Sequence, residues 1–298
     1  MDNRSHVYLD YAATTPLDEG VLTAMMPYFT RHFGNPSSVH FFGQQAEAAL
    51  EDSREKVASH FGAHPDEILF TSGGTESDNL AIRGAAFARR QKYGCNRILT
   101  TPVEHHAVTH TVEQLARLYG FSVDTLPVDA SGKVDPDDLR KMLTRDVALV
   151  SVIYANNEIG TINPMVELAR VCRELGVPLH TDAVQAAAHL LMDAIHLKAD
   201  MVSIGAHKFY GPKGVGALYL RAGIDRMPVQ TGGGQEYNLR AGTENVPYIV
   251  GLAESFALAQ SHTVERAERF CQMRDHLIEG VLSLIPNGKL SGHRTDRL

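Results

Sequence analysis

The chain has 298 residues, 44% of them hydrophobic and 21% charged, and its 28 Lys and Arg against 35 Asp and Glu give a net charge of −7. This balance argues against nucleic acid or an anionic membrane as the main partner, and no apolar run approaches the ~20 residues that span a bilayer. Three scattered cysteines, Cys95, Cys172 and Cys271, are too few for a disulfide framework or a zinc cluster. Because residues 1–4 contain no apolar signal core, we expect a cytoplasmic protein.

The N-terminal part of the chain is expected to be irregular and then helical. A short extended piece over residues 7–11 leads into a loop, and a helix is expected from about Leu17 to Arg31. Gly, Pro, Asn and Ser cluster over residues 33–38, which marks a second loop. From Gln44 to Phe61 apolar residues recur at helical spacing opposite a charged face, which predicts an amphipathic surface helix.

From residue 68 onward, short apolar runs alternate with helical stretches. The runs that indicate buried strands are 68–71, 97–101, 121–126, 147–152, 177–181, 201–204 and 216–220. The clearest helix is 164–175, with Asn163 as its cap, Pro164 at its first position and Gly176 at its exit. This alternation predicts an α/β fold with a mainly parallel seven-stranded sheet between layers of helices, and ligands at the carboxyl ends of its strands.

The C-terminal part is expected to leave this sheet. A glycine-rich loop over 232–245 precedes a long helical region over 246–284, which would connect to a second domain. We therefore expect three parts: residues 1–16 as an N-terminal segment of a small domain, 17–245 as a large domain, and 246–298 as the connecting helix and the start of an incomplete small domain.

Lys208 is expected at the end of a buried strand. The apolar run Met201 to Ile204 forms the strand, and the small residues Gly205 and Ala206 allow the chain to turn before the lysine. Desolvation there would favour the neutral amine, which can condense with a carbonyl to form a Schiff base. Taken alone, Lys208 is more simply interpreted as a surface lysine in a glycine-rich loop, so a catalytic role depends on partners elsewhere in the chain.

A glycine turn follows the predicted strand 68–71. Gly73, Gly74 and Thr75 lead from that strand into a helix. Free backbone N–H groups, the helix dipole and the Thr75 hydroxyl would suit a phosphate. An ordinary strand-to-helix turn is the alternative.

Histidines and amides follow two further strands. His105 comes after the strand 97–101 and could stack on a planar ring. His106 and His110 lie four residues apart on a predicted helix, as in a metal site, but no third ligand is evident. Asn157 follows the strand 147–152 with an amide suited to a phenolic or carboxylate oxygen.

Asp182 is the strongest candidate partner for Lys208. A carboxylate at the end of a buried strand is costly unless it meets a cation or several donors, and a protonated pyridine nitrogen is one such cation. Together with Lys208, a phosphate turn and a stacking histidine, it meets the needs of pyridoxal 5'-phosphate (PLP), whose ring is an electron sink only while its nitrogen stays protonated. Taken singly, Asp182 could be a helix cap and Gln185 a polar helix residue.

The blocks around these residues resemble the cysteine desulfurases, class V relatives of the aminotransferases. They lie at 8–15, 33–38, 71–79, 104–107, 156–160, 180–185, 203–214 and 232–245, so the match covers nearly the whole chain. The resemblance implies a PLP-dependent homodimer of fold type I that takes sulfur from L-cysteine, leaves L-alanine and passes the sulfur as a protein persulfide to an acceptor such as an iron-sulfur scaffold. A selenocysteine lyase, another class V PLP enzyme, or a non-catalytic PLP-binding or dimerisation protein remain alternatives.

The resemblance also implies roles for the residues around the cofactor ring. Lys208 would be the internal aldimine lysine, and Asp182 would pair with the pyridine nitrogen. His105 would stack on the ring and take part in proton transfer. Gln185 would contact the ring hydroxyl, and Asn157 would contact the ring or the substrate.

The resemblance assigns a second set of residues to the cofactor phosphate. Gly74, Thr75 and His207 would hold the phosphate, and Thr243 would reach in from the other subunit. Some members of the family carry a phosphate-binding serine two residues before the histidine, where this chain has Gly205.

The resemblance further implies that the persulfide-forming cysteine is not among these residues. In the family this cysteine and an arginine for the substrate carboxylate lie in the C-terminal small domain, at positions expected beyond Leu298. Cys172 belongs to an amphipathic stripe, Cys271 to the long helix and Cys95 to a turn before a strand, so none has the exposed setting of a nucleophile. We therefore expect a cysteine desulfurase chain that stops before its nucleophile.

Overall fold

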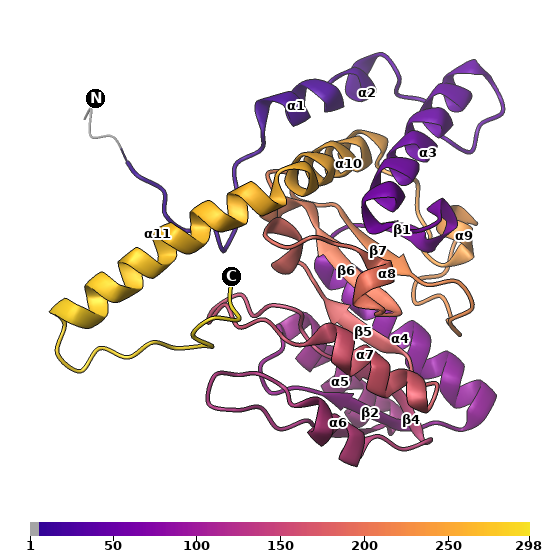
Figure 1. The fold of residues 1–298 in the computed structure, drawn as a ribbon. Helices are drawn as coiled ribbons and strands as arrows, with labels where there is room; N and C mark the ends of the chain where they lie inside the picture. Colours follow the sequence, from indigo (N-terminus) through magenta and orange to yellow (C-terminus); the bar gives the residue numbers. More distant parts are fainter. Residues whose placement is uncertain (1–5) are drawn as a thin grey trace.

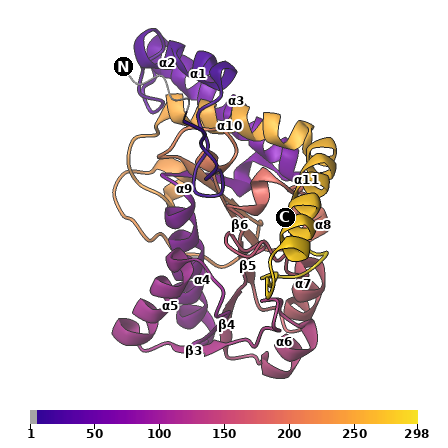
Figure 2. The same ribbon diagram turned by 90° about the vertical axis from the view of Figure 1, so that its left-hand side faces the viewer.

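The computed structural model describes residues 6–298, and a seven-stranded sheet lies between two layers of helices (Figures 1 and 2). The strands are β1 (Ile68–Thr71), β2 (Arg97–Thr100), β3 (Ser122–Thr125), β4 (Val147–Ser151), β5 (Leu179–Asp182), β6 (Met201–Gly205) and β7 (Gly216–Leu220). Their order is β1-β7-β6-β5-β4-β2-β3, and β7 runs antiparallel to both of its neighbours while the other neighbouring strands pair in parallel. The predicted fold class is confirmed.

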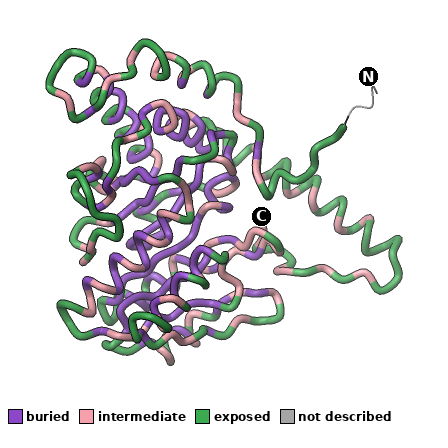
Figure 3. Tube along the Cα trace, turned by 180° about the vertical axis from the view of Figure 1, so that it is seen from behind, coloured by how far each residue is buried: buried purple, intermediate pink, exposed green. Residues whose placement is uncertain are grey.

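Side chains of each strand alternate between the two helical layers. Helices α4 (Gly74–Tyr93) and α5 (His106–Tyr119) cover one face, where the apolar cluster includes Met201 and Leu218. The other face is covered by four helices, α3 (Phe41–Phe61), α6 (Pro136–Met142), α7 (Met165–Glu174) and α10 (Val246–Ser261). The strands other than β3 and the inward sides of these helices are largely buried (Figure 3). The edge strand β3, which the apolar run indicated as buried, consists of exposed and half-buried residues.

Two helix predictions near the N-terminus need correction. The single helix expected over 17–31 is two, α1 (Glu19–Met25) and α2 (Pro27–Thr30), because Pro27 has no N–H with which to continue α1. Helix α3 begins at Phe41 and not at Gln44. The ring of His40 accepts the N–H of Gly43 at 3.3 Å, which caps the helix three residues earlier than the apolar pattern indicated.

Two further helix predictions were wrong. Asn163 does not cap α7, because its side chain accepts from Val134 N at 2.9 Å and donates to Ile153 O at 2.8 Å. The continuous helix expected over 246–284 is divided at His262, whose φ of −122° and ψ of 22° separate α10 from α11 (Thr263–Leu284). Short helices α8 (Ala194–Leu197) and α9 (Gln235–Asn238) complete the set.

Residues from both ends of the chain, among them Tyr11 and Leu298, line a cavity next to the loop after β6. Helix α11 extends away from the body of the protein (Figure 1), and several of its apolar side chains are exposed. The N-terminal segment returns to the end of β6, where Thr15 N donates to His207 O at 2.9 Å. The division at residues 16 and 245 stays a prediction, and residues 1–4, which prompted the cytoplasmic expectation, lie outside the described residues. Across residues 6–298, no helix is both long and apolar enough to cross a bilayer.

Candidate active site

The carboxyl ends of five parallel strands open onto one cavity of about 260 Å³. The predicted site residues that line it are Gly74, Thr75, His105, Asn157, Asp182, Gln185, His207 and Lys208. Their positions follow β1, β2, β4, β5 and β6, as expected for ligand sites in such sheets. Thr243 is exposed and does not line this cavity, so its contact with a second subunit stays a prediction.

Lys208 lies on a short 3₁₀ turn, Ala206–Lys208, directly after β6. Its ammonium donates to the carbonyl oxygens of Ala13, at 2.9 Å, and of Ala12. Burial lowers the pKa of Lys208, although the negative charge of Asp182 opposes this effect. The amine therefore loses its proton more readily than an exposed lysine does.

Asp182 is the last residue of β5 and is only 5% exposed. One of its oxygens accepts from Val184 N at 2.9 Å. Burial, reinforced by the charge of Asp78, raises the pKa of Asp182 to about 7. Because a single neutral donor does not offset the burial of a charge, a cation that entered the cavity would find an unsatisfied carboxylate.

Two histidines and an asparagine line the rest of the cavity. His105 caps α5, since its Nδ1 accepts from Ala107 N at 3.1 Å, so a neutral ring carries its proton on Nε2. His207 Nδ1 lies 3.2 Å from Thr14 Oγ1, and burial lowers its pKa. Asn157 lines the cavity, whereas the neighbouring Asn156 donates to Val103 O at 2.9 Å and stabilises the loop.

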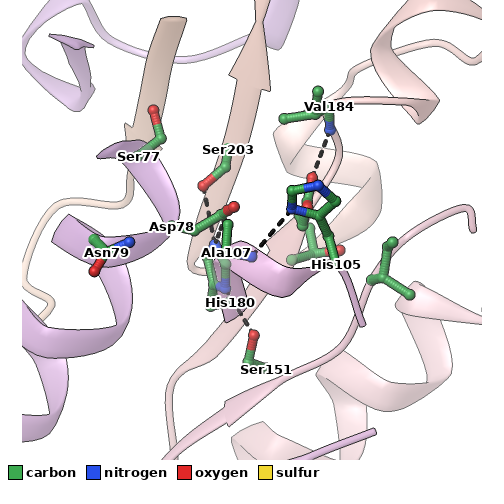
Figure 4. Close-up of polar contacts among 12 residues, drawn as sticks. Ser77, Asp78, Asn79, His105, Ala107, Ser151, His180, Val184 and Ser203 are labelled. Atoms are coloured by element: carbon green, nitrogen blue, oxygen red, sulfur yellow. Dashed lines mark hydrogen bonds and ion pairs between the residues drawn. The ribbon is translucent and has the colours of Figure 1, made fainter. Parts of the chain in front are cut away.

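A buried polar cluster beside Asp182 was missed in the sequence (Figure 4). His180 lies two residues before Asp182 on β5, so both side chains face α4. The His180 ring lies 2.8 Å from Ser151 Oγ and 3.0 Å from Ser203 Oγ, and its Nε2 lies 3.4 Å from an oxygen of Asp78. One signal was available, because Asp78 is the only charged residue among the buried residues of α4, most of which are Ala, Leu or Ile.

Two other residue groups from the sequence lie outside this cavity. The rings of His106 and His110 stack with their centroids 5.0 Å apart, and residues 6–298 hold no group of three or more His, Cys, Asp or Glu placed to bind a metal. Cys95 and Cys172 are buried, Cys271 is partly exposed on α11, and none of them lines the cavity. Burial raises the pKa of Cys172, as expected of a core thiol.

Comparison with known proteins agrees with this geometry. Residues 7–297 match the family described as aminotransferase class-V. The chain is 50% identical over 295 residues to the cysteine desulfurase IscS of Dictyoglomus turgidum, which covers 99% of this chain and 74% of the relative. A solved NifS-like protein superposes with a TM-score of 0.90 at 40% identity, covering 94% of this chain and 76% of the other.

A second solved structure, SspA in complex with cysteine, has a TM-score of 0.80 at 40% identity and covers 84% of this chain and 72% of the other. The fold is therefore that of the PLP-dependent enzymes of fold type I. Within that class, the chain belongs to the aminotransferase class-V family and, among its members, to the cysteine desulfurases.

The cavity residues fit PLP, the cofactor of this family. The buried Asp182 accepts a hydrogen bond from Val184 N and forms no ion pair within the described chain, and the buried Oε1 of Gln185 has no hydrogen-bond partner there. At the other end of the cavity, a Cβ on Gly74 would lie 2.3 Å from Val184 Cγ2, and Gly73 has a φ of 155°. Only glycines suit both positions, so the backbone N–H groups at the start of α4 stay accessible for a phosphate.

Proposed function

We propose that this chain carries the PLP-dependent removal of sulfur from L-cysteine, which leaves L-alanine. The observation that supports it best is the placement of Lys208 and Asp182 at the ends of neighbouring strands β6 and β5, lining one cavity. The cysteine in the solved SspA complex supports the choice of substrate. When bound, PLP supplies an electron sink that weakens the bonds around the α-carbon of an amino acid.

Lys208 and Asp182 have complementary roles in this proposal. Lys208 Nζ holds the cofactor covalently and accepts or returns a proton, for which its lowered pKa suits it. Asp182 keeps the pyridine nitrogen protonated, because a buried carboxylate gains most by pairing with a cation. We assign stacking and proton transfer to His105, the ring hydroxyl contact to Gln185, and a ring or substrate contact to Asn157.

The phosphate contacts lie at the start of α4 in this proposal. Gly74 and Thr75 offer backbone N–H groups and a hydroxyl there, and His207 lines the same cavity. We infer that the active protein is a homodimer in which Thr243 reaches the phosphate of the other subunit, since Thr243 is exposed and outside its own cavity. Such a dimer would supply sulfur in the cytoplasm for iron-sulfur cluster assembly or for a thiolation pathway.

The thiol that receives the sulfur is proposed to lie outside these 298 residues. A persulfide acceptor must be an accessible thiolate, and Cys95 and Cys172 are buried. Cys271 lies on the long helix α11 and does not line the cavity. Replacing all three by alanine should therefore leave alanine formation with a small added thiol unchanged, as measured by chromatography; loss of that activity in a folded Cys271→Ala variant would contradict this.

The experiment that tests the function uses two lysines of the same loop. Lys208→Ala should lose both the PLP absorbance that survives gel filtration and the formation of alanine from cysteine. Lys213→Ala, an exposed lysine five residues away, should keep both. PLP that is still attached to a lysine in the Lys208→Ala protein, detected by borohydride reduction and peptide mapping, would refute the assignment.

Assays on the purified wild-type protein distinguish two alternative functions from this proposal. A selenocysteine lyase would form alanine from selenocysteine and not from cysteine. A non-catalytic PLP-binding or dimerisation protein would bind PLP through Lys208 and form no alanine from either amino acid, even with added thiol.

A further inference from the structure

Buried polar side chains on three neighbouring strands, Ser151, His180 and Ser203, lie in a row (Figure 4). Ser151 on β4 is the register partner of His180 on β5, and Ser203 on β6 is the register partner of Asp182. Asp78 reaches this row from α4 and also lines the cofactor cavity. The strand register therefore connects the cavity to a polar cluster that has no access to solvent, since Ser151, His180 and Ser203 are each 0% exposed and Asp78 is 1% exposed.

The hydrogen bonds of this cluster leave one carboxyl oxygen without a partner. His180 Nδ1 lies 2.8 Å from Ser151 Oγ and Nε2 lies 3.0 Å from Ser203 Oγ. The Oδ1 atom of Asp78 lies 3.4 Å from His180 Nε2 and has no hydrogen bond in the described structure. A buried carboxylate oxygen without a donor is strongly disfavoured, whereas a protonated carboxyl could donate to the ring nitrogen of His180 from this position.

Burial favours the neutral form of Asp78, and ionised acids nearby would repel a charge on it. Asp182 on β5 and Glu104 before α5 are those acids. Burial raises the pKa of both, the charge of Asp78 adds to this effect in both, and the charge of Asp182 adds to it in Glu104. Burial raises the pKa of Asp78 itself to about 7, against a smaller effect of the Ser203 hydroxyl. Burial lowers the pKa of His180 to about 4, so this ring is neutral near pH 7 and gives Asp78 no cation.

Of the three remaining basic groups of the cavity, His207 contacts Thr14, and the other two act mainly on Asp182. His105 lowers the pKa of Asp182 by its charge, and Asp182 in turn raises that of Lys208. Neither basic group is hydrogen-bonded to Asp78, because His105 accepts from Ala107 N and Lys208 donates to backbone carbonyls. The two acids that face the cavity therefore differ, since only Asp182 lies among basic groups.

We propose that Asp78 is a positioning residue, held as a neutral carboxylic acid against a neutral His180, so that the negative charge of the cavity resides on Asp182 alone. The inference deepens the proposed function, because a single charge beside one ring nitrogen fixes which acid pairs with the cofactor. Two ionised carboxylates in one cavity would repel each other and compete for the same cation.

The first test needs no cofactor. In cofactor-free protein at pH 6, infrared difference spectra between wild type and Asp78→Asn should show the loss of a protonated carboxyl C=O band. The matched control Asp52→Asn, at an exposed position on α3, should lose only a carboxylate band. A spectrum in which Asp78→Asn also loses only a carboxylate band would overturn the proposal.

The second test measures PLP affinity at pH 6, below the pKa of Asp78, by fluorescence titration. Asn is neutral and can still donate to His180, so Asp78→Asn should bind PLP within about threefold of wild type, as expected when a neutral group replaces a neutral group. Asp182→Asn should bind PLP more than about 100-fold more weakly, because it removes one member of a buried charged pair.

If Asp78→Asn weakens PLP binding as much as Asp182→Asn does, Asp78 is the anion, and the proposal is overturned. Failure of wild type to bind PLP would instead refute the proposed function, and the infrared result on cofactor-free protein would still decide the state of Asp78.

Discussion

Two buried acids of this protein, Glu236 and Asp78, have different partners. Glu236, in the short helix α9, pairs with the guanidinium of Arg54 on α3 at 2.9 Å, and the same carboxylate accepts from Phe70 N at 2.8 Å. Arg54 also donates to Ile68 O at 2.7 Å. In the cofactor cavity, by contrast, Asp78 has an oxygen with no hydrogen-bond partner in the described structure.

The difference separates a structural site from a binding site. The pair formed by Arg54 and Glu236 satisfies its own charges and covers the free edge of β1, which would otherwise expose unpaired backbone groups. It also holds three consecutive residues with positive φ, Glu236, Tyr237 and Asn238, in a conformation that costs about 1–3 kcal/mol per residue. The cavity leaves polar atoms unsatisfied, which is the state expected of a site completed by a ligand.

The largest effect is expected from breaking the paired site. Arg54→Ala should lower the free energy of unfolding by about 3–5 kcal/mol, because it leaves Glu236 buried without a countercharge. Lys56 lies on the same helix as Arg54 and forms a partly exposed ion pair with Glu254 of α10. Lys56→Ala removes this pair and should lower the free energy of unfolding by less than about 1 kcal/mol. Urea denaturation of both proteins measures this, and equal losses would contradict the comparison.

A slightly smaller effect is expected from Asp78, as a change of the free energy of unfolding with pH. Because the folded-state pKa of Asp78 is about 7 and its ordinary value is 3.8, the folded protein holds a proton that the unfolded chain releases. Stability from this group is fully present below pH 4 and is lost as pH rises towards 7. At about 1.4 kcal/mol per pKa unit the loss is at most about 4 kcal/mol.

Asp78→Asn should therefore flatten the fall in stability of the cofactor-free protein between pH 4 and pH 8, and make it more stable than wild type at pH 8. Thermal unfolding across this pH range measures the effect, with Asp52→Asn as the exposed control. If the stability of wild type and of Asp78→Asn changes with pH in the same way, Asp78 does not have a raised pKa in the folded protein.

The smallest of the three effects is expected at the phosphate turn. Gly74→Ala should weaken PLP binding by about 1–3 kcal/mol, because the new Cβ would lie 2.3 Å from Val184 Cγ2 and push the turn away. Shortening the neighbour in a Gly74→Ala, Val184→Ala double variant should recover much of the loss, as a double-mutant cycle can show. If the double variant is no better than the single one, steric contact at Val184 is not the cause.

The sequence was sufficient for the sheet and for most of the cavity. Buried strands such as 147–152 are apolar runs of recognisable length. Because ligands bind at strand ends in such sheets, the sequence alone predicts that Gly74, Asp182 and Lys208 lie close together. The boundaries were less accurate, because β5 begins at Leu179 where the apolar run indicated Val177.

What could not be predicted depends on contacts between distant elements. The contact of Asp78 with His180 requires the packing of α4 on β5. Asn163 was expected to cap a helix, but its side chain forms hydrogen bonds with Val134 and Ile153 in two other segments. The break at Pro27 is different, since the missing N–H of proline was visible in the sequence.

The contact between the N-terminal segment and the loop after β6 has a consequence for folding. Thr15 donates its hydroxyl to His207 O across 192 residues, and Ala13 accepts from Lys208 across 195. Closing so long a loop is slow compared with forming neighbouring strands and helices. We expect the residues around Lys208 to become protected from hydrogen exchange later than β4 and β5 do during refolding, so that a newly made chain acquires its cofactor only near the end of its folding.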